Sequence, residues 1–163
     1  MRWIRHLFLD YFALKSAFPD ASLAAIERGV AAQESRHRGE LRFAIEGGLP
    51  IQALLSGRTA HERALEHFAR LRVWDTEDNA GVLIYLLLAD RRVEIVADRG
   101  IHARVGGTAW ETICGAMQRE FAAGRFEPGV LAGLGSVSDL LAQHFPAKPG
   151  DNPNELPDSP AVL

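Results

Sequence analysis

Hydrophobic residues along this chain fall into runs whose spacing separates strands from helices. Residues 82–88 are continuously apolar and rich in branched side chains, which predicts a strand covered on both faces. Residues 93–97 alternate more weakly around one glutamate, as expected nearer the edge of a sheet. Asp90 and Arg91 between them fit a hairpin link. Residues 40–46 also alternate and end before Gly-Gly-Leu-Pro, so they are predicted to form the first strand.

Apolar residues at helical spacing predict the helices. Residues 21–34 carry an apolar stripe. Two possible capping boxes, at Thr59 with Glu62 and at Thr108 with Glu111, each precede a helical stretch. The first of these helices should run to about residue 71, and the last helix should begin near Pro128 and end before residues 145–146. The side chains expected to be buried by the helix after Thr59 are Leu65, Phe68 and Leu71.

The order of these elements predicts an α/β fold. A strand–helix–strand unit favours a right-handed parallel crossover, and the third strand should return antiparallel beside the second. Helices on both faces would explain the fully apolar strand. We therefore expect a three-layer α/β/α sandwich with a small mixed central sheet.

The two ends of the chain flank one predicted domain. Residues 1–18 are expected to form an N-terminal amphipathic helix packed on the domain, because Trp3, Leu7, Tyr11 and Leu14 recur at helical spacing. The alternative is a surface patch for a membrane or a partner. Residues 19–146 form the expected domain. Residues 147–163 are Pro-rich and have no apolar period, so they indicate a tail or clasp rather than a packed element.

Composition narrows the classes of function. The 163 residues suit one domain with a sizeable core. A net charge of −3 argues against a dedicated nucleic-acid binder. The only cysteine, Cys114, excludes an intrachain disulfide and a Cys-based zinc site, and its helical position predicts a core residue. No apolar stretch reaches the ~18–20 residues of a membrane span. The basic start has no small-residue cleavage site, so we expect a cytoplasmic protein.

Acidic residues gather where the second strand begins and the third ends. In the predicted topology both positions, and the start of the first strand, lie at one edge of the sheet. Oxygen ligands at one place are what a hard divalent cation needs, so we predict a Ca²⁺ or Mg²⁺ site. Ligands of open α/β sheets usually bind at the opposite edge, so this prediction depends on the converging carboxylates alone. The predicted ligands are Glu40, Asp75, Asp78, Asn79 and Asp98.

Each of these residues also has an ordinary explanation. Aspartates in turns satisfy backbone donors, and Glu40 could face solvent, as could Glu34 on the preceding helix. Arg36, Arg38 or Arg99 could neutralise the cluster in place of a metal. His37 is interpreted as a surface histidine. Because no nucleophile or phosphate-binding loop is recognisable, the residues do not specify a reaction.

The chain resembles the TPM domain family, named partly after a thylakoid lumen protein. The resemblance covers roughly residues 20–158. It is carried by four runs and by the glycines and aromatics that follow them: residues 39–42 (Gly-Glu-Leu-Arg), Arg63-Ala64, residues 75–85 (Asp-Thr through Asn-Ala-Gly-Val-Leu-Ile-Tyr) and residues 98–101 (Asp-Arg-Gly-Ile). The resemblance implies an α/β/α sandwich, a Ca²⁺ or Mg²⁺ site in some members, and a proposed acid phosphatase activity in plant members. Many members have a signal peptide and a membrane anchor, which we do not expect here.

Two functions follow. We favour a non-catalytic, cation-stabilised scaffold that engages a protein partner through its N-terminal helix or its C-terminal tail. The alternative is a metal-dependent hydrolase of phosphate monoesters. In the alternative, Asp75 and Asp78 would ligate the ion, and Asp98 or Glu40 would ligate it or accept a proton. The scaffold is favoured because the sequence has no evident nucleophile and no basic cluster aimed at a phosphate.

Overall fold

The central sheet has four strands in the order β3-β2-β1-β4 in a computed structural model that describes residues 11–150 and 153–163. Strand β1 (Glu40–Glu46) runs parallel to β2 (Gly81–Leu87), and β3 (Arg92–Ala97) returns antiparallel to β2. These three strands and their directions confirm the prediction. The short strand β4 (Ala161–Val162) pairs in parallel with β1 and was not predicted.

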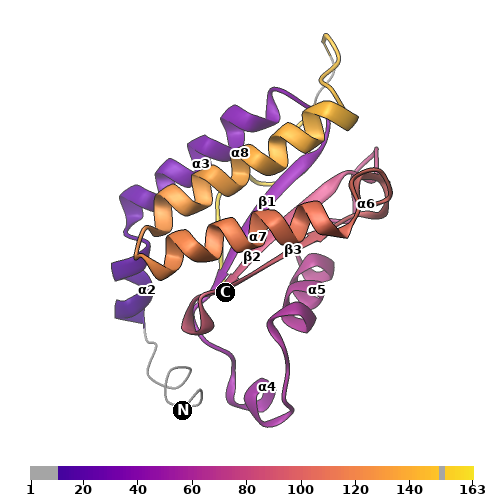
Figure 1. The fold of residues 1–163 in the computed structure, drawn as a ribbon. Helices are drawn as coiled ribbons and strands as arrows, with labels where there is room; N and C mark the ends of the chain where they lie inside the picture. Colours follow the sequence, from indigo (N-terminus) through magenta and orange to yellow (C-terminus); the bar gives the residue numbers. More distant parts are fainter. Residues whose placement is uncertain (1–10, 151–152) are drawn as a thin grey trace.

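Helices cover both faces of this sheet, which confirms the three-layer α/β/α sandwich (Figure 1). One face packs against α2, α3, α7 and α8, and the other face packs against α5. The short helices α4 and α6 precede α5 and follow β3. The bounds are α2 (Tyr11–Ala17), α3 (Asp20–Glu34), α4 (Ile51–Leu55), α5 (Ala60–Arg70), α6 (Arg99–Val105), α7 (Gly107–Ala122) and α8 (Phe126–His144).

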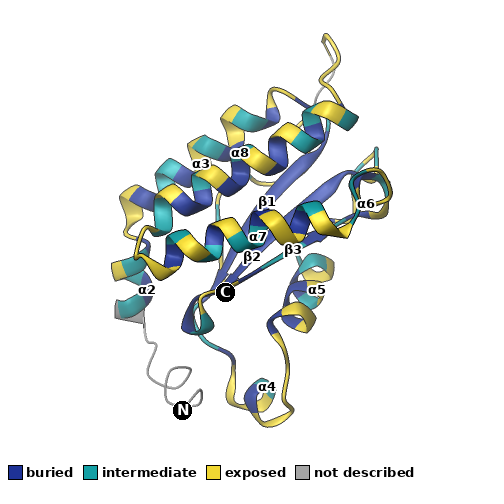
Figure 2. Ribbon diagram, in the orientation of Figure 1, coloured by how far each residue is buried: buried dark blue, intermediate teal, exposed yellow. Residues whose placement is uncertain are grey.

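The sheet separates two apolar cores because alternate strand residues face opposite helices. Phe43 and Ile84 belong to the larger core with α3, α7 and α8, whereas Ala44 and Leu83 belong to the smaller core with α5. Every residue of β1 and β2 is buried, and β3 at the edge is only partly so (Figure 2). The continuous apolar run of β2 therefore reports burial on both faces.

Several local predictions were wrong. Helix α7 begins at Gly107 without a side-chain cap, so Thr108 and Glu111 form no capping box. Helix α6 was not predicted, and Asp98 is its N-cap. The capping box of Thr59 with Glu62 is confirmed. Short helices such as α6 escape detection because they are too brief to display an apolar period.

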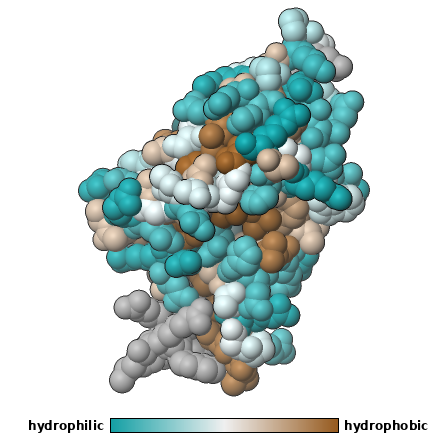
Figure 3. Space-filling model, turned by 45° about the vertical axis from the view of Figure 1, so that its right-hand side comes forward, coloured by the Kyte–Doolittle hydropathy of each residue, from teal (hydrophilic) through white to brown (hydrophobic). Residues whose placement is uncertain are grey.

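The buried face of α5 also differs from the prediction. Leu65 is 46% exposed, while Arg63 and His67 face the sheet and are buried. The apolar residues alone had defined the expected stripe, but two long polar side chains occupy the core-facing positions. Apolar side chains are exposed elsewhere, on α4. Its Ile51 and Leu55 are exposed, and brown atoms mark the lower tip of the molecule in Figure 3.

The ends of the chain are only partly described. Most of the predicted N-terminal helix, residues 1–10, lies outside the described residues, and α2 follows it with Leu14 buried in the larger core. Among the helices of the described residues, none is long and apolar enough to cross a membrane. Residues 153–163 return to β1, where Leu156 is buried in the smaller core, so this part of the C-terminal segment is packed.

Candidate functional site

The start of β2 lies beside the end of β3, at the end of the sheet where β1 and β2 begin. The Asp98 N–H donates to the Gly81 carbonyl at 2.8 Å, which closes the antiparallel ladder. The loop before β2 ends at Asn79, whose positive φ of 51° turns the chain into the strand. The Asn79 carbonyl accepts from the Ile101 N–H at 3.3 Å, so this loop lies against the first turn of α6. Its close approach requires Gly100, where a Cβ would collide with the Asn79 carbonyl.

Asp98 holds a buried carboxylate oxygen at this edge. Its Oδ1 accepts the Arg99 N–H at 2.7 Å and caps α6. Its Oδ2 is buried and has no hydrogen-bond partner among the described residues. A buried carboxylate oxygen without a donor is unfavourable unless a water or a cation reaches it. Asp98 is therefore the predicted ligand whose unused oxygen is buried.

The two neighbouring aspartates are paired with arginines. Asp78 forms an ion pair with Arg38 at 2.5 Å, and the Arg38 Nε donates to the Pro146 carbonyl at 3.2 Å. Asp75 pairs with Arg72, and both of these side chains are largely exposed. The sequence left open neutralisation by Arg38, which pairs with Asp78 here, whereas the pairing of Asp75 with Arg72 was not predicted.

Glu40 lies in the same row of the sheet as Asp98 but is separated from it. Glu40 pairs with Gly81 in the register, and Gly81 pairs in turn with Asp98. A Cβ on Gly81 would overlap the Val73 carbonyl oxygen, so the backbone at Val73 occupies the space between the two carboxylates. Adjacent strands are about 4.8 Å apart, which leaves roughly 10 Å between the Cα atoms of Glu40 and Asp98.

Glu40 instead holds the C-terminal segment. Its two carboxylate oxygens accept the N–H groups of Glu155 and Leu156 at 3.2 and 3.1 Å. Glu40 is buried, contrary to the solvent-facing alternative. Burial, opposed by these two hydrogen bonds, raises the pKa of Glu40 to about 7.

Glu34 and Arg42 complete this attachment, which we call the C-terminal clasp (Glu34, Glu40, Arg42 and residues 155–159). Glu34 is buried, accepts the Leu41 N–H at 2.9 Å and is hydrogen-bonded to Asp158. Burial raises the pKa of Glu34 to about 8. The Arg42 guanidinium donates to the carbonyls of Pro157 and Ser159. The clasp therefore explains why two carboxyl groups are buried at the start of β1.

Two interpretations of single residues have clear outcomes. His37 was expected at the surface but is fully buried, and its Nδ1 lies 2.9 Å from the Gly39 carbonyl. Burial lowers the pKa of His37 to about 4, so this imidazole is neutral at physiological pH. Cys114 packs against the larger core as expected, and burial raises the pKa of its thiol to about 11. That thiol is therefore no candidate nucleophile at neutral pH.

A buried polar network under α5 was not predicted. Arg63 donates to Glu46 and contacts His67 Nε2 at 3.0 Å, and the Tyr85 hydroxyl donates to Glu46. Burial alone would raise the pKa of Glu46, but the hydrogen bonds from His67, Arg63 and Tyr85 outweigh it and lower the pKa to about 2. The only sequence signal was the acidic residue that closes the alternating first strand.

The predicted metal ligands are therefore divided among three places. Asp78 and Asn79 lie on the loop that packs beside Asp98, Asp75 projects to the surface, and Glu40 belongs to the C-terminal clasp. In the part of the chain that the structure describes, no three His, Cys, Asp or Glu side chains are arranged to hold a metal ion. Any cation at this edge would depend on Asp98 Oδ2 and on a rearrangement at Asp78.

Comparisons with known proteins place the fold. A solved structure similar to this chain is the BA42 protein of the psychrophilic bacterium Bizionia argentinensis, with 29% identity, a TM-score of 0.78, and coverage of 90% of this chain and 95% of that chain. The N-terminal domain of a P. gingivalis protein is similar in fold, with 20% identity and a TM-score of 0.61 over 80% of this chain and 82% of that chain. No curated protein shows significant similarity. The family model of the TPM domain matches residues 13–140, and this chain therefore belongs to the TPM domain family.

Proposed function

We propose that this chain is a TPM domain that binds a divalent cation, Ca²⁺ or Mg²⁺, at Asp98 and acts as a cation-dependent, non-catalytic binding module. The observation that carries the proposal is the buried Asp98 Oδ2 without a hydrogen-bond partner among the described residues. Native proteins rarely leave such an atom unsatisfied, so its environment invites a ligand. A hard cation suits a carboxylate oxygen best.

The remaining ligands would come from the loop that packs beside α6. Asp78 supplies a carboxylate and Asn79 an amide oxygen, and water would complete the shell, since both ions take at least six oxygens. Arg38 holds Asp78 in this structure, so cation binding would require Asp78 to exchange the guanidinium for the ion. The donor set fits the cation on this condition.

That exchange would give cation binding a structural consequence. Arg38 also donates to the Pro146 carbonyl and lies over the Phe145 ring, with its Cζ 5.8 Å from the ring centroid. Release of Arg38 from Asp78 would therefore change the chain that leaves α8. A module whose surface responds to a cation needs such a connection between its site and a distant segment.

Calorimetric titration of Ca²⁺ and of Mg²⁺ into chelator-treated protein tests the proposal. We expect saturable binding that Asp98→Asn abolishes and that Arg38→Gln tightens, because the competing guanidinium is removed. Asp139→Asn is the matched control, since exposed Asp139 of α8 also pairs with an arginine, Arg36, away from Asp98. Equal binding by wild type and Asp98→Asn, or no binding up to millimolar ion, would refute the site.

A second candidate is the hydrolysis of phosphate monoesters. It is favoured by Arg38, because a guanidinium released beside a bound cation could hold a phosphoryl oxygen. The cation would polarise the phosphoryl group when bound. Cation-dependent turnover of p-nitrophenyl phosphate, lost in Asp98→Asn and in Arg38→Gln, would establish this function. Cation binding without turnover would leave the non-catalytic module.

A further inference from the structure

The outer side of β3 is one of the two open edges of the sheet formed by the described strands, and the other is the two-residue strand β4. Along a strand in an antiparallel pair, residues alternate between those whose backbone N–H and C=O groups point toward the neighbouring strand and those whose backbone groups point away from it. Because the Asp98 N–H donates to Gly81 on β2, residues 92, 94 and 96 face β2 and residues 93, 95 and 97 face outward. This edge therefore presents backbone groups of Val93 and Ile95 at the spacing of a strand.

Side chains of α7 occupy the places where a further strand would bind. The Val93 N–H donates to the side-chain carbonyl of Gln118 at 3.1 Å. The Ile95 N–H is directed at the Cys114 sulfur, which is a weak acceptor. The amide of Gln118 has the same chemistry as a peptide unit, so it stands in for the backbone of an absent strand.

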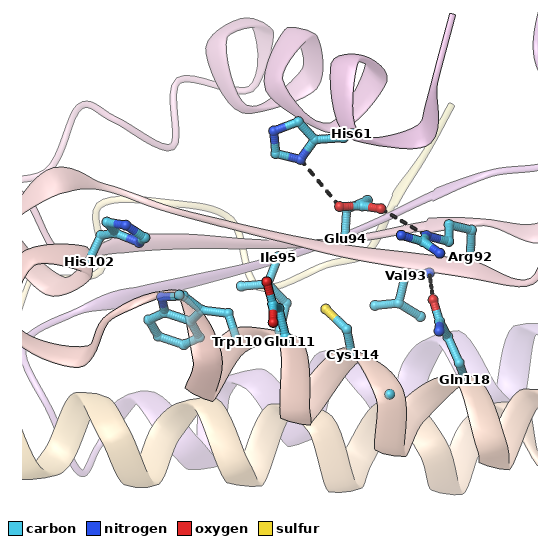
Figure 4. Close-up of a pocket in the computed structure, with 12 residues that line it drawn as sticks. His61, Arg92, Val93, Glu94, Ile95, His102, Trp110, Glu111, Cys114 and Gln118 are labelled. Atoms are coloured by element: carbon cyan, nitrogen blue, oxygen red, sulfur yellow. Dashed lines mark hydrogen bonds and ion pairs between the residues drawn. The ribbon is translucent and has the colours of Figure 1, made fainter.

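A pocket of about 340 Å³ lies along this edge, between β3, α7 and His61 of α5. Figure 4 shows His61 on one side of β3, and Trp110, Cys114 and Gln118 projecting from α7 on the other side. Trp110 is 5% exposed, and its indole N–H has no hydrogen-bond partner among the described residues. This buried N–H is an unused donor beside the pocket, and a ligand that displaced the side chains covering it would gain by placing an acceptor such as a carbonyl oxygen there.

We infer that this pocket is a peptide-binding groove in which an extended segment of another protein adds to β3 as a further strand. Its carbonyl oxygens would accept the Val93 and Ile95 N–H groups and the Trp110 indole N–H in place of Gln118 and Cys114. Backbone pairing of this kind gives affinity, and the alternate side chains give specificity. The groove lies along β3 and does not depend on the proposed cation site at Asp98.

The charged side chains of β3 indicate which residues an added peptide strand should carry. Arg92 and Glu94 project toward α5, where Glu94 accepts from Arg92 Nε at 2.9 Å and lies 3.2 Å from His61 Nδ1. Val93 and Ile95 project toward α7 and pack in the larger core. An antiparallel partner should therefore alternate, with apolar residues toward α7, a basic residue opposite Glu94 and an acidic residue opposite Arg92.

The probe is a capped, fluorescein-labelled peptide with the sequence threonine-valine-lysine-valine-glutamate-valine-threonine. Placed antiparallel to β3, it sets its lysine opposite Glu94 and its glutamate opposite Arg92. The matched control peptide replaces the central valine by proline, which keeps both charges and removes the central N–H. We expect saturable binding of the first peptide by fluorescence anisotropy and at least tenfold weaker binding of the second.

Two variants and one resonance locate the site. Trp110→Phe should weaken binding about fivefold, the effect of one neutral hydrogen bond. Ile95→Pro should abolish binding, because it removes an outward N–H and leaves the ladder to β2 intact. Trp74→Phe is the control, since Trp74 is exposed outside this pocket. The ¹⁵N-labelled indole signal that Trp110→Phe removes should move downfield in wild-type protein when peptide binds.

The outcomes separate this inference from its competitors. Absence of saturable binding up to millimolar peptide, equal binding of the proline peptide, or an unmoved Trp110 indole signal would overturn it. A dimer in solution that Ile95→Pro dissociates would also overturn it, because a second copy would then fill the groove. The Asp98→Asn variant should still bind the peptide, so failure of the cation site would not mimic failure of the groove.

Discussion

The buried carboxyl group of Glu34 supplies a stringent test of the C-terminal clasp. Replacement of Glu34 by glutamine keeps an acceptor for the Leu41 N–H and adds an N–H donor toward Asp158. Glu34→Gln therefore imitates the protonated carboxyl that this buried position favours. The variant should be more stable than wild type at neutral pH, because folding then no longer requires the carboxyl to take up a proton that the unfolded chain has lost.

The size of the effect follows from the pKa of Glu34, which burial raises from 4.5 to about 8. Between these two values the folded protein holds a proton that the unfolded chain has lost, so stability falls as the pH rises through this window. One pKa unit equals about 1.4 kcal/mol. The uptake of this proton on folding therefore lowers the free energy of unfolding of the wild type by roughly 3 kcal/mol at pH 7 and by under about 1 kcal/mol at pH 5. Glutamine has no such cost.

Urea unfolding followed by circular dichroism at both pH values measures this difference. Glu34→Gln should raise the free energy of unfolding by about 3 kcal/mol at pH 7 and by much less at pH 5. Glu27→Gln, an exposed change on the same helix, should stay within about 0.5 kcal/mol of wild type at both. A destabilised Glu34→Gln variant at pH 7, or an equal gain at both pH values, would refute the reasoning.

Three further predictions concern α5 and two glycines. Arg63→Ala leaves Glu46 buried without its guanidinium and should lower stability by about 3–5 kcal/mol in a thermal melt, whereas exposed Arg70→Ala should change it little. Because the pKa of Glu46 is lowered from 4.5 to about 2, the stability that this pair contributes is present above the unfolded value and is lost as the pH falls toward 2. Acid unfolding curves of wild type and Arg63→Ala should therefore converge, and parallel curves would contradict the pairing. Gly81→Ala should cost more than about 3 kcal/mol in urea unfolding, because its methyl group would meet a backbone carbonyl. Gly135→Ala faces open space and should add about 1 kcal/mol to helix stability, so equal effects at the two glycines would exclude this explanation.

The sequence by itself determined the three long strands, their order and the long helices that cover them. The pattern of apolar residues reports burial: β1 alternates, β2 is a continuous apolar run buried on both faces, and β3 alternates more weakly at the side of the sheet. The capping box of α5 was readable for the same reason, since its residues lie three apart in the chain. Strand directions followed from connection lengths and the handedness of the crossover.

Only the tertiary structure decided which polar residues meet. Glu40 and Asp98 share a row of the sheet as predicted, but Gly81 between them admits the Val73 backbone and keeps them apart. The pairing of Asp78 with Arg38 and the arrival of the C-terminal segment at Glu40 join residues that are distant in sequence.

The same holds for the polar network and the edge groove. Arg63 could replace an apolar residue on the buried face of α5 because Glu46 of β1 meets it there. The orphaned indole of Trp110 becomes visible only once α7 lies beside β3. Periodicity is a local property and records burial, whereas hydrogen bonds and ion pairs depend on contacts across the fold. The layers of the fold can therefore be predicted from local sequence patterns, whereas the candidate sites form only when distant segments meet in the folded chain.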